Sequence, residues 1–202
     1  MNWYEKLQRY FPEDEMKSKE HMELLLKEKG DVYFKDEGPD HVLMFAEFPT
    51  FLFIDYVYVS KESRGQGIGH QLFEKLKQKN KPIILEVEPL DYSDSDTSKR
   101  LHFYQREGFK HAAAIGYTHQ SLVTDQSSTL EILYWSPHDE NEEEVYQQMK
   151  MMYEDIHTYK DKELYGKTYR SVDEAVKYDT NRKSDNIFHS IQKMNDKSSE
   201  KP

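Results

Sequence analysis

The chain has 202 residues, which is enough for one full-sized α/β domain with a short extension but not for two large domains. Its 38 acidic residues outnumber its 28 basic ones, and the formal net charge of −10 disfavours nucleic acids and anionic membranes as partners. The chain has no cysteine, which excludes thiol nucleophiles, disulfides and Cys-ligated metal sites and is compatible with the cytoplasmic location that we expect. Neither an apolar leader nor a membrane span is predicted, because the longest apolar stretch, 42–59, is interrupted by Glu47, Pro49 and Asp55.

The first third of the chain predicts two helices followed by three antiparallel strands. Apolar residues recur at helical spacing over residues 3–11 and 13–29, and Gly30 ends the second stretch. Short apolar runs separated by turn residues then predict strands over 31–34, 41–48 and 51–59.

The middle of the chain predicts a strand, a glycine-rich loop, a helix and a second, buried strand over 82–89. A polar, acidic segment at 91–96 precedes a helix predicted over 97–107, which Gly108 ends. Two further strands are predicted over 110–123 and 129–135. The sheet-forming part closes near Pro137, so we expect one domain over 1–137.

The remaining residues, 138–202, are predicted to form a helical extension with a disordered end. An acidic run at 139–144 is typical of a helix N-terminus. Apolar residues then follow one helix face, namely Val145, Met149, Met152, Ile156 and Tyr159. This face is expected to pack on its own domain, with a homodimer interface as the alternative. Shorter helices are predicted over 172–178 and 186–194.

The segment Arg-Gly-Gln-Gly-Ile-Gly, residues 64–69, lies between a predicted strand and a predicted helix. Glycines let backbone N–H groups approach a ligand closely, and a helix N-terminus attracts anions, so this pattern favours a phosphate site. It fits the Walker loop poorly, because His70 and Gln71 follow the last glycine in place of Lys and Ser/Thr. It also fits the dinucleotide fingerprint poorly, since the third glycine comes one residue early. A tight turn without a ligand is the remaining alternative.

Several motifs in order resemble the GNAT superfamily of acyl-CoA-dependent N-acetyltransferases. Arg64, Gly67 and Gly69 occupy the places of its Arg/Gln-x-x-Gly-x-Gly/Ala loop. Residues 54–76 resemble the family's fourth strand, loop and third helix, and 100–109 resemble the helix that ends in Tyr-x-x-x-Gly-Phe. The resemblance covers 31–135 and is strongest over 53–109. It implies an α/β (α+β) fold with a mixed, mostly antiparallel sheet that is split at a V-shaped cleft and flanked by helices.

The resemblance also implies that the chain uses acetyl-CoA as co-substrate and no metal. Backbone N–H groups of the glycine loop would hold the pyrophosphate, and the strand before the loop would offer main-chain groups to pantetheine. The Arg64 side chain would assist with charge or brace the loop. The expected cofactor-binding residues are Val57, Tyr58, Val59, Arg64, Gly65, Gln66, Gly67, Ile68, Gly69 and His70.

Tyr104 occupies the family position that protonates the departing thiolate, and a phenol within hydrogen-bond reach is suited to that step. The alternative is a packing role. The acceptor amine must lose a proton before it attacks, and Asp55 is the favoured base because it interrupts an apolar strand. Other candidates are Glu47, Glu86 and Glu88 or water alone.

The predicted reaction is direct transfer of an acetyl group to a primary amine of a small molecule, a peptide or a protein, without an acyl-enzyme. The family's usual Asn after the fifth strand is absent, and the acidic segment 91–96 stands there, which suggests a cationic acceptor. The nine histidines show no repeated metal-ligand spacing, so no metal site is predicted. The alternatives are a catalytically silent acyl-CoA sensor or adaptor, and a nucleotide-binding or structural domain unrelated to CoA.

Overall fold

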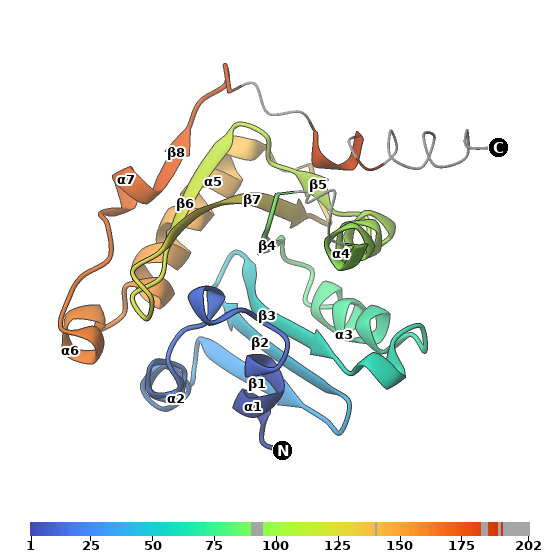
Figure 1. Ribbon diagram of the computed structural model, residues 1–202. Coiled ribbons are helices and arrows are strands. Elements are labelled where there is room, and N and C mark those ends of the chain that lie inside the picture. The colour runs from blue at the N-terminus through green and yellow to red at the C-terminus, as the bar shows by residue number, and fades with distance from the viewer. Residues whose placement is uncertain (90–94, 140, 183–185, 190, 192–202) are drawn as a thin grey trace.

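The computed structural model describes residues 1–89, 95–139, 141–182, 186–189 and 191. A mixed sheet of eight strands forms its centre (Figure 1). The strands are β1 (Tyr33–Glu37), β2 (His41–Glu47), β3 (Leu52–Val59), β4 (Ile83–Val87), β5 (Lys110–His111), β6 (Ile115–Gln120), β7 (Ser127–Trp135) and β8 (Val176–Tyr178). Their order is β1-β2-β3-β4-β7-β6-β8, with β5 paired to β7. Within the described ranges the only parallel pair is β3–β4, which confirms the predicted mixed, mostly antiparallel sheet.

Strands β3 and β4 stay paired over only part of their length. Pairing runs from Leu52 with Ile83 to Ile54 with Leu85, and both strands then continue without a shared register. The predicted split of the sheet therefore lies between the C-terminal ends of β3 and β4.

A β-bulge bends β3 at the point where this split begins. Phe45 of β2 faces Ile54, whereas the preceding Met44 faces Tyr56, so Asp55 has no partner across the ladder. An extra residue on one strand increases its local bend and twist. The bulge therefore helps β3 to turn away from β4.

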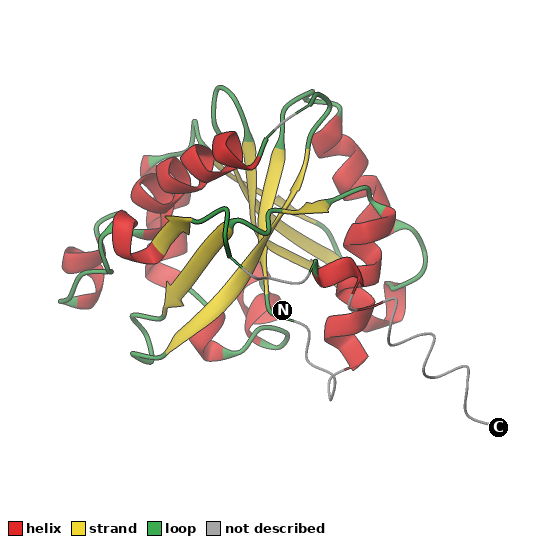
Figure 2. Cartoon of the chain, turned by 90° about the horizontal axis from the view of Figure 1, so that it is seen from above, coloured by secondary structure: helices red, strands yellow, loops and turns green. Residues whose placement is uncertain are grey.

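Helices cover both faces of the sheet (Figures 1 and 2). The α-helices are α1 (Trp3–Gln8), α2 (Lys19–Glu28), α3 (Ile68–Lys77), α4 (Ser95–Arg106), α5 (Glu142–Met152), α6 (Asp161–Tyr165) and α7 (Val172–Ala175). Two 3-10 turns, η1 (Glu13–Glu15) and η2 (Lys61–Ser63), and a π-helical turn, η3 (Tyr153–His157), complete the elements. No helix within the described ranges is both long and apolar enough to cross a bilayer.

Each face of the sheet has its own apolar core, because successive strand residues point to opposite faces. Phe53 and Ile84 belong to the core beneath α1, α2 and α5, and Ile54 and Leu85 belong to the core beneath α3 and α4. Residues of the C-terminal extension enter both cores, since Met149 lies in the first and Ile191 in the second. The extension thus packs on the main body of the chain.

The helix predicted over 13–29 is interrupted, and this prediction was wrong in its continuity. Residues 16–18 are extended between η1 and α2, and Ser18 caps α2 by accepting a hydrogen bond from His21 N. The side chain of Lys17 thereby turns inward, where it reaches Asp55. A buried ion pair has overridden the helical periodicity of the sequence.

Two other predictions need correction. The strand predicted over 110–123 is divided, because residues 112–114 bulge between β5 and β6 while both strands pair with β7. The helix predicted over 172–178 gives way after one turn to β8, which pairs with the free edge of β6. An unpaired sheet edge favours an added strand over a short isolated helix. The predicted acidic loop at 91–96 and the disordered end lie largely outside the described residues. Of the helix predicted over 186–194, residues 186–189 and 191 are described, and 187–189 and 191 are helical.

Candidate active site

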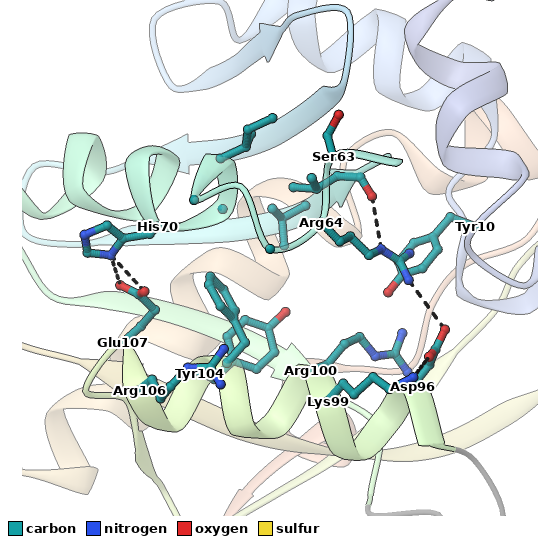
Figure 3. Close-up of a pocket in the computed structure, with 17 residues that line it drawn as sticks. Tyr10, Ser63, Arg64, His70, Asp96, Lys99, Arg100, Tyr104, Arg106 and Glu107 are labelled. Atoms are coloured by element: carbon teal, nitrogen blue, oxygen red, sulfur yellow. Dashed lines mark hydrogen bonds and ion pairs between the residues drawn. The ribbon is translucent and has the colours of Figure 1, made fainter. Parts of the chain in front are cut away.

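A cavity of about 560 Å³ lies between α4 and the loop that joins η2 to α3 (Figure 3). Most of the cofactor-binding residues expected from the sequence line it, namely Val57, Val59, Arg64, Gly65, Gly67, Ile68, Gly69 and His70. Tyr58 and Gln66 are not among its lining residues. The Tyr58 ring packs against Tyr10, and the Gln66 amide donates to the Glu62 carbonyl.

The glycine loop has the backbone geometry that a phosphate cradle needs. Gly65 and Gly67 have φ of +82° and +84°, a left-handed conformation that glycine adopts without a Cβ penalty. A Cβ built on either residue would meet no atom within 4 Å, so the space above the loop is open. Gly67 caps α3 without a side-chain hydrogen bond, which leaves the first N–H groups of this helix available to an anion.

Gly69 is needed for a different reason, because it lets α3 approach α4 closely. A Cβ on Gly69 would lie 3.1 Å from Cζ of Phe103, which is tighter than ordinary van der Waals contact. Phe103 in turn packs edge-on against Phe73 of α3, with ring centroids 5.2 Å apart. The third glycine of the motif thus sets the spacing of the cavity walls.

The cavity gathers positive charge in an acidic protein. Four cationic side chains, Arg64, Lys99, Arg100 and Arg106, line it. Sequence reasoning singled out the first alone, since the other three lie on a helix whose orientation only the fold fixes. Cationic groups beside open helix N–H groups suit a ligand that carries several phosphates.

Arg64 also braces the loop, as its alternative role predicted. Its Nε donates to the Val59 carbonyl at 3.4 Å, and its Nη1 lies 3.6 Å from Oδ2 of Asp96 on α4 (Figure 3). The guanidinium therefore links both sides of the cavity.

Tyr10 is a lining residue that the sequence gave no reason to select. It lies just after α1, and the guanidinium carbons of Arg64 and Arg100 lie 5.1 and 5.9 Å from its ring centroid. Such cation–π contacts hold the N-terminal segment against the wall of the cavity. No local pattern marks Tyr10, because its partners are far away in the sequence.

Tyr104 lies on the α4 wall of the same cavity, where Figure 3 shows its hydroxyl directed into the open space. Its ring packs against Phe73, Phe103 and Phe109. Burial raises the pKa of this phenol above its ordinary value, and the nearby Tyr10 adds to the effect. Tyr104 therefore keeps its proton at neutral pH and can donate it.

A second, smaller cavity of about 70 Å³ adjoins the first. Both cavities are lined by Tyr10, Val57, Arg100 and Tyr104, so they meet at the split between β3 and β4. The smaller cavity adds three carboxylates, Glu15, Glu86 and Glu88. The two compartments differ in the balance of charge. Four cationic side chains outnumber Asp96 and Glu107 in the larger cavity, and the three carboxylates outnumber Arg100 in the smaller one.

Two of these carboxyl groups titrate near neutral pH. Burial raises the pKa of Glu86 to about 7, with the Asp55 charge acting in the same direction. Burial and a hydrogen bond to Glu88 raise the pKa of Glu15 to about 8. Glu88 itself forms an ion pair with Arg100. Glu86 is thus able to accept and release a proton near pH 7.

Asp55, the base favoured from the sequence, is not among the residues that line either cavity. Its carboxylate lies 2.6 Å from Lys17 Nζ and accepts a hydrogen bond of 2.5 Å from the Tyr33 hydroxyl. Glu47 binds Lys79 and Lys81 and also lies outside both linings. The structure brings Glu86 and Glu88 to the site instead of these two.

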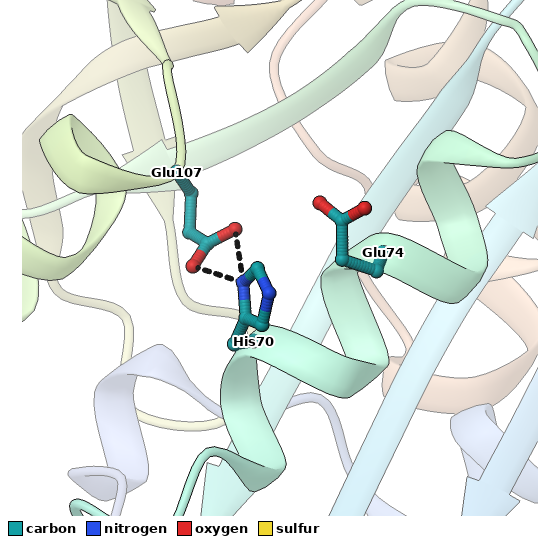
Figure 4. Close-up of side chains that lie close together, drawn as sticks. All are labelled: His70, Glu74 and Glu107. Atoms are coloured by element: carbon teal, nitrogen blue, oxygen red, sulfur yellow. Dashed lines mark hydrogen bonds and ion pairs between the residues drawn. The ribbon is translucent and has the colours of Figure 1, made fainter.

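His70, Glu74 and Glu107 come together beside the larger cavity (Figure 4). Their ligand atoms lie within 4.8 Å of one another, a spacing that a metal ion could bridge. Lys77 Nζ already lies 2.8 Å from Glu107 and 2.9 Å from Glu74, so one ammonium group forms ion pairs with both carboxylates. The cluster is accounted for as an ion-pair network, and the absence of a metal stays a prediction.

The fold and the site together combine a split sheet with an open glycine loop at a helix N-terminus, an arrangement that suits a phosphate-bearing ligand. Residues 28–111 match the family described as "Acetyltransferase (GNAT) domain". The chain is 60% identical over 191 residues to "Putative acetyltransferase YjbC" of Bacillus subtilis (strain 168), which covers 95% of this chain and 100% of that protein. The chain belongs to the GNAT family of acetyltransferases. The membership of the GNAT superfamily that the sequence motifs predicted is thereby confirmed.

A solved structure shares the fold. It is titled "Putative acetyltransferase from GNAT family from Bacteroides thetaiotaomicron", and it matches with a TM-score of 0.54 and 22% identity over 82% of this chain and 90% of that one. The match covers 82% of this chain, which is more than residues 1–137 can supply, so the fold likeness includes part of the C-terminal extension.

Proposed function

We propose that this protein transfers the acetyl group of acetyl-CoA directly to a primary amine. The observation that carries the proposal is the junction of the two cavities at Tyr104 and Val57, where β3 and β4 part. A donor bound on the cationic side and an amine bound on the carboxylate side would meet there. Holding both reactants in line supplies much of the rate enhancement in such a reaction.

The larger cavity supports acetyl-CoA as the donor. Its glycine loop offers open N–H groups, and its cationic side chains suit a pyrophosphate, as described above. The main-chain groups of β3 beyond Ile54 have lost their β4 partner, which frees one edge of the strand for pantetheine. GNAT enzymes in general use this co-substrate.

Tyr104 and Glu86 are the proposed acid and base. The acceptor ammonium gives a proton to the Glu86 carboxylate, and the neutral nitrogen attacks the acetyl carbonyl carbon to form the C–N bond. The C–S bond then breaks, and the Tyr104 phenol protonates the departing thiolate. The second proton lost by the nitrogen restores the phenol, so one proton in total is released for each amide formed.

The test uses the purified full chain with acetyl-CoA and a panel of primary amines that includes benzylamine, spermidine and a lysine-containing peptide. Thiol release and the mass of the acetylated amine are measured together. We expect equimolar CoA and amide from at least one acceptor. Binding of acetyl-CoA without any amide would favour the acyl-CoA sensor, and a lack of binding would overturn the proposal. A cationic acceptor, a homodimer and a cytoplasmic location stay predictions.

A further inference from the structure

A hydrogen bond joins the C-terminal extension to the proposed base. Nε2 of His157 lies 2.8 Å from Oε1 of Glu86, and the two side chains are only 5% and 13% exposed. His157 lies beyond residues 28–111, so the match to the GNAT domain does not include it. The two residues are separated by 71 positions in the sequence, so no local sequence pattern predicts their contact.

The His157 ring is fixed by its surroundings. It stacks on Tyr117 at an interplanar angle of 18°, and it packs edge-on against Phe53 and Tyr153. The backbone contributes as well, because His157 ends the π-helical turn η3 and Thr158 N donates to the Tyr153 carbonyl at 3.0 Å. Single π-turns occur often at functional sites, where they reorient a side chain.

The direction of the hydrogen bond follows from the charge of the two groups. Burial lowers the pKa of His157 well below its ordinary value, and the Lys17 ammonium acts in the same direction, so the ring is neutral. An ionised carboxylate can only accept hydrogen bonds, so whenever Glu86 is ionised, Nε2 of His157 carries the donated proton. This bond favours the ionised form of Glu86 against the cost of burial.

Other groups face Glu86 from the elements packed around it. They are Tyr117 and His119 of β6, Lys17 before α2, and Asp55 of β3. The Tyr117 hydroxyl also hydrogen-bonds to the carboxylate. Removing the His157 bond therefore leaves Glu86 with one donor fewer but does not leave it without partners.

We infer that His157 is a positioning residue, which holds the Glu86 carboxylate ionised and oriented into the smaller cavity beside Tyr104. The C-terminal extension would then complete the active site in addition to packing on the sheet. The inference rests on the proposed function, because it gives Glu86 the part of proton acceptor.

The chain offers a matched control in a second buried His–Glu pair. Nε2 of His111 lies 2.9 Å from Oε2 of Glu131, with side-chain exposures of 0% and 12%. Neither residue lines either of the two cavities described above. Loss of this pair perturbs the core without touching the site.

The first experiment titrates the side-chain carboxyl of Glu86 by NMR in the full chain labelled with 13C-glutamate, with Glu86→Gln used for assignment. His157→Phe keeps an aromatic ring but removes the donor, and His157→Gln keeps a donor at similar reach. Because hydrogen bonds to a charged group are strong, we expect His157→Phe to raise the Glu86 midpoint by about one pH unit or more. His157→Gln should keep the Glu86 midpoint close to the wild-type value. His111→Phe should not shift the midpoint.

The second experiment measures the pH dependence of kcat for the best amine of the panel. In His157→Phe the rise of kcat should move to higher pH by the same amount, with roughly fivefold loss at pH 7 and recovery near pH 9. The Kd for acetyl-CoA should not change. A merely structural role would lower activity at every pH, as we expect for any loss caused by His111→Phe.

An unchanged Glu86 midpoint in His157→Phe would overturn the inference. So would a shifted midpoint with an unshifted kcat profile, because Glu86 would then not limit transfer. If the wild-type chain binds acetyl-CoA but acetylates no amine, the proposed function fails. The NMR titration would still decide whether His157 controls the charge of Glu86.

Discussion

The ammonium group of Lys17 lies 2.6 Å from the carboxylate of Asp55, and the two side chains are only 6% and 3% exposed. Removing one partner from a buried pair leaves an uncompensated charge, which typically costs about 3–5 kcal/mol. We therefore expect Asp55→Asn to lower the free energy of unfolding by about that amount, as measured by urea denaturation.

The double variant Lys17→Met with Asp55→Asn is the control for this pair. It removes both charges and should recover much of the lost stability. If Asp55→Asn alone leaves the free energy of unfolding unchanged but abolishes amine acetylation, the result would support Asp55 as the base.

Gly67→Asp should abolish the stabilisation of the protein by acetyl-CoA. The substitution places a side chain and a negative charge in the open space above the loop, where φ is +84°. For the wild type, acetyl-CoA at about a hundredfold excess over Kd should add about 2.7 kcal/mol to the free energy of unfolding. Thermal unfolding with and without acetyl-CoA measures the difference.

Gly166→Asp is the matched control, because Gly166 also has a positive φ, +69°, with no atom within 4 Å of a built Cβ. It ends α6 and lines neither cavity. This variant should lose a similar amount of stability from placing a side chain at a positive φ. It should still be stabilised by acetyl-CoA as the wild type is. Loss of the shift in both variants would contradict a specific role for the glycine loop.

Tyr104→Phe should lower kcat by about 10²-fold, because it removes the proton donor for the thiolate. The Kd for acetyl-CoA should stay the same, since the aromatic contacts with Phe73 and Phe109 remain. Steady-state kinetics and calorimetry check the two values. Tyr146→Phe, a change outside both cavities where the ring packs on Tyr178, should leave kcat unaltered. Equal kcat for the Tyr104 variant and the wild type would remove Tyr104 from the mechanism.

Glu15→Gln should stabilise the protein at high pH. The pKa of Glu15 is raised from 4.5 to about 8 in the folded state, so folding favours the protonated form. The stability that this group contributes is fully present below pH 4.5 and is lost as the pH rises through about 8. Melting temperatures should therefore agree at pH 5, and the variant should melt higher at pH 9. The exposed Glu13→Gln serves as the control, and an equal difference at both pH values would contradict the prediction.

The half of the candidate site that contains the glycine loop and Tyr104 could be predicted from local sequence. Arg64, Gly67 and Gly69 lie within six positions, and a glycine loop that feeds a helix has a local backbone requirement that a single segment can satisfy. Tyr104 followed from its place before Gly108 and Phe109 in a short motif. The split sheet followed from the same family motifs.

The other half of the site depended on contacts between distant segments. Asp55 was the favoured base from the sequence because it interrupts an apolar strand. In the structure its carboxylate instead pairs with the buried Lys17 and Tyr33. Glu86 was one of several carboxylates, and burial against His157 distinguished it.

The sequence by itself determined the family, the glycine loop and the alternation that gives the sheet two apolar faces, since each depends on residues that are neighbours in the chain. Only the tertiary structure decided which carboxylate lines the smaller cavity, that Tyr10 lines both cavities, and that the C-terminal extension reaches the site through His157. The physical reason is that burial and charge act through space, so a carboxyl group acquires its pKa and its partners only when distant segments fold against it.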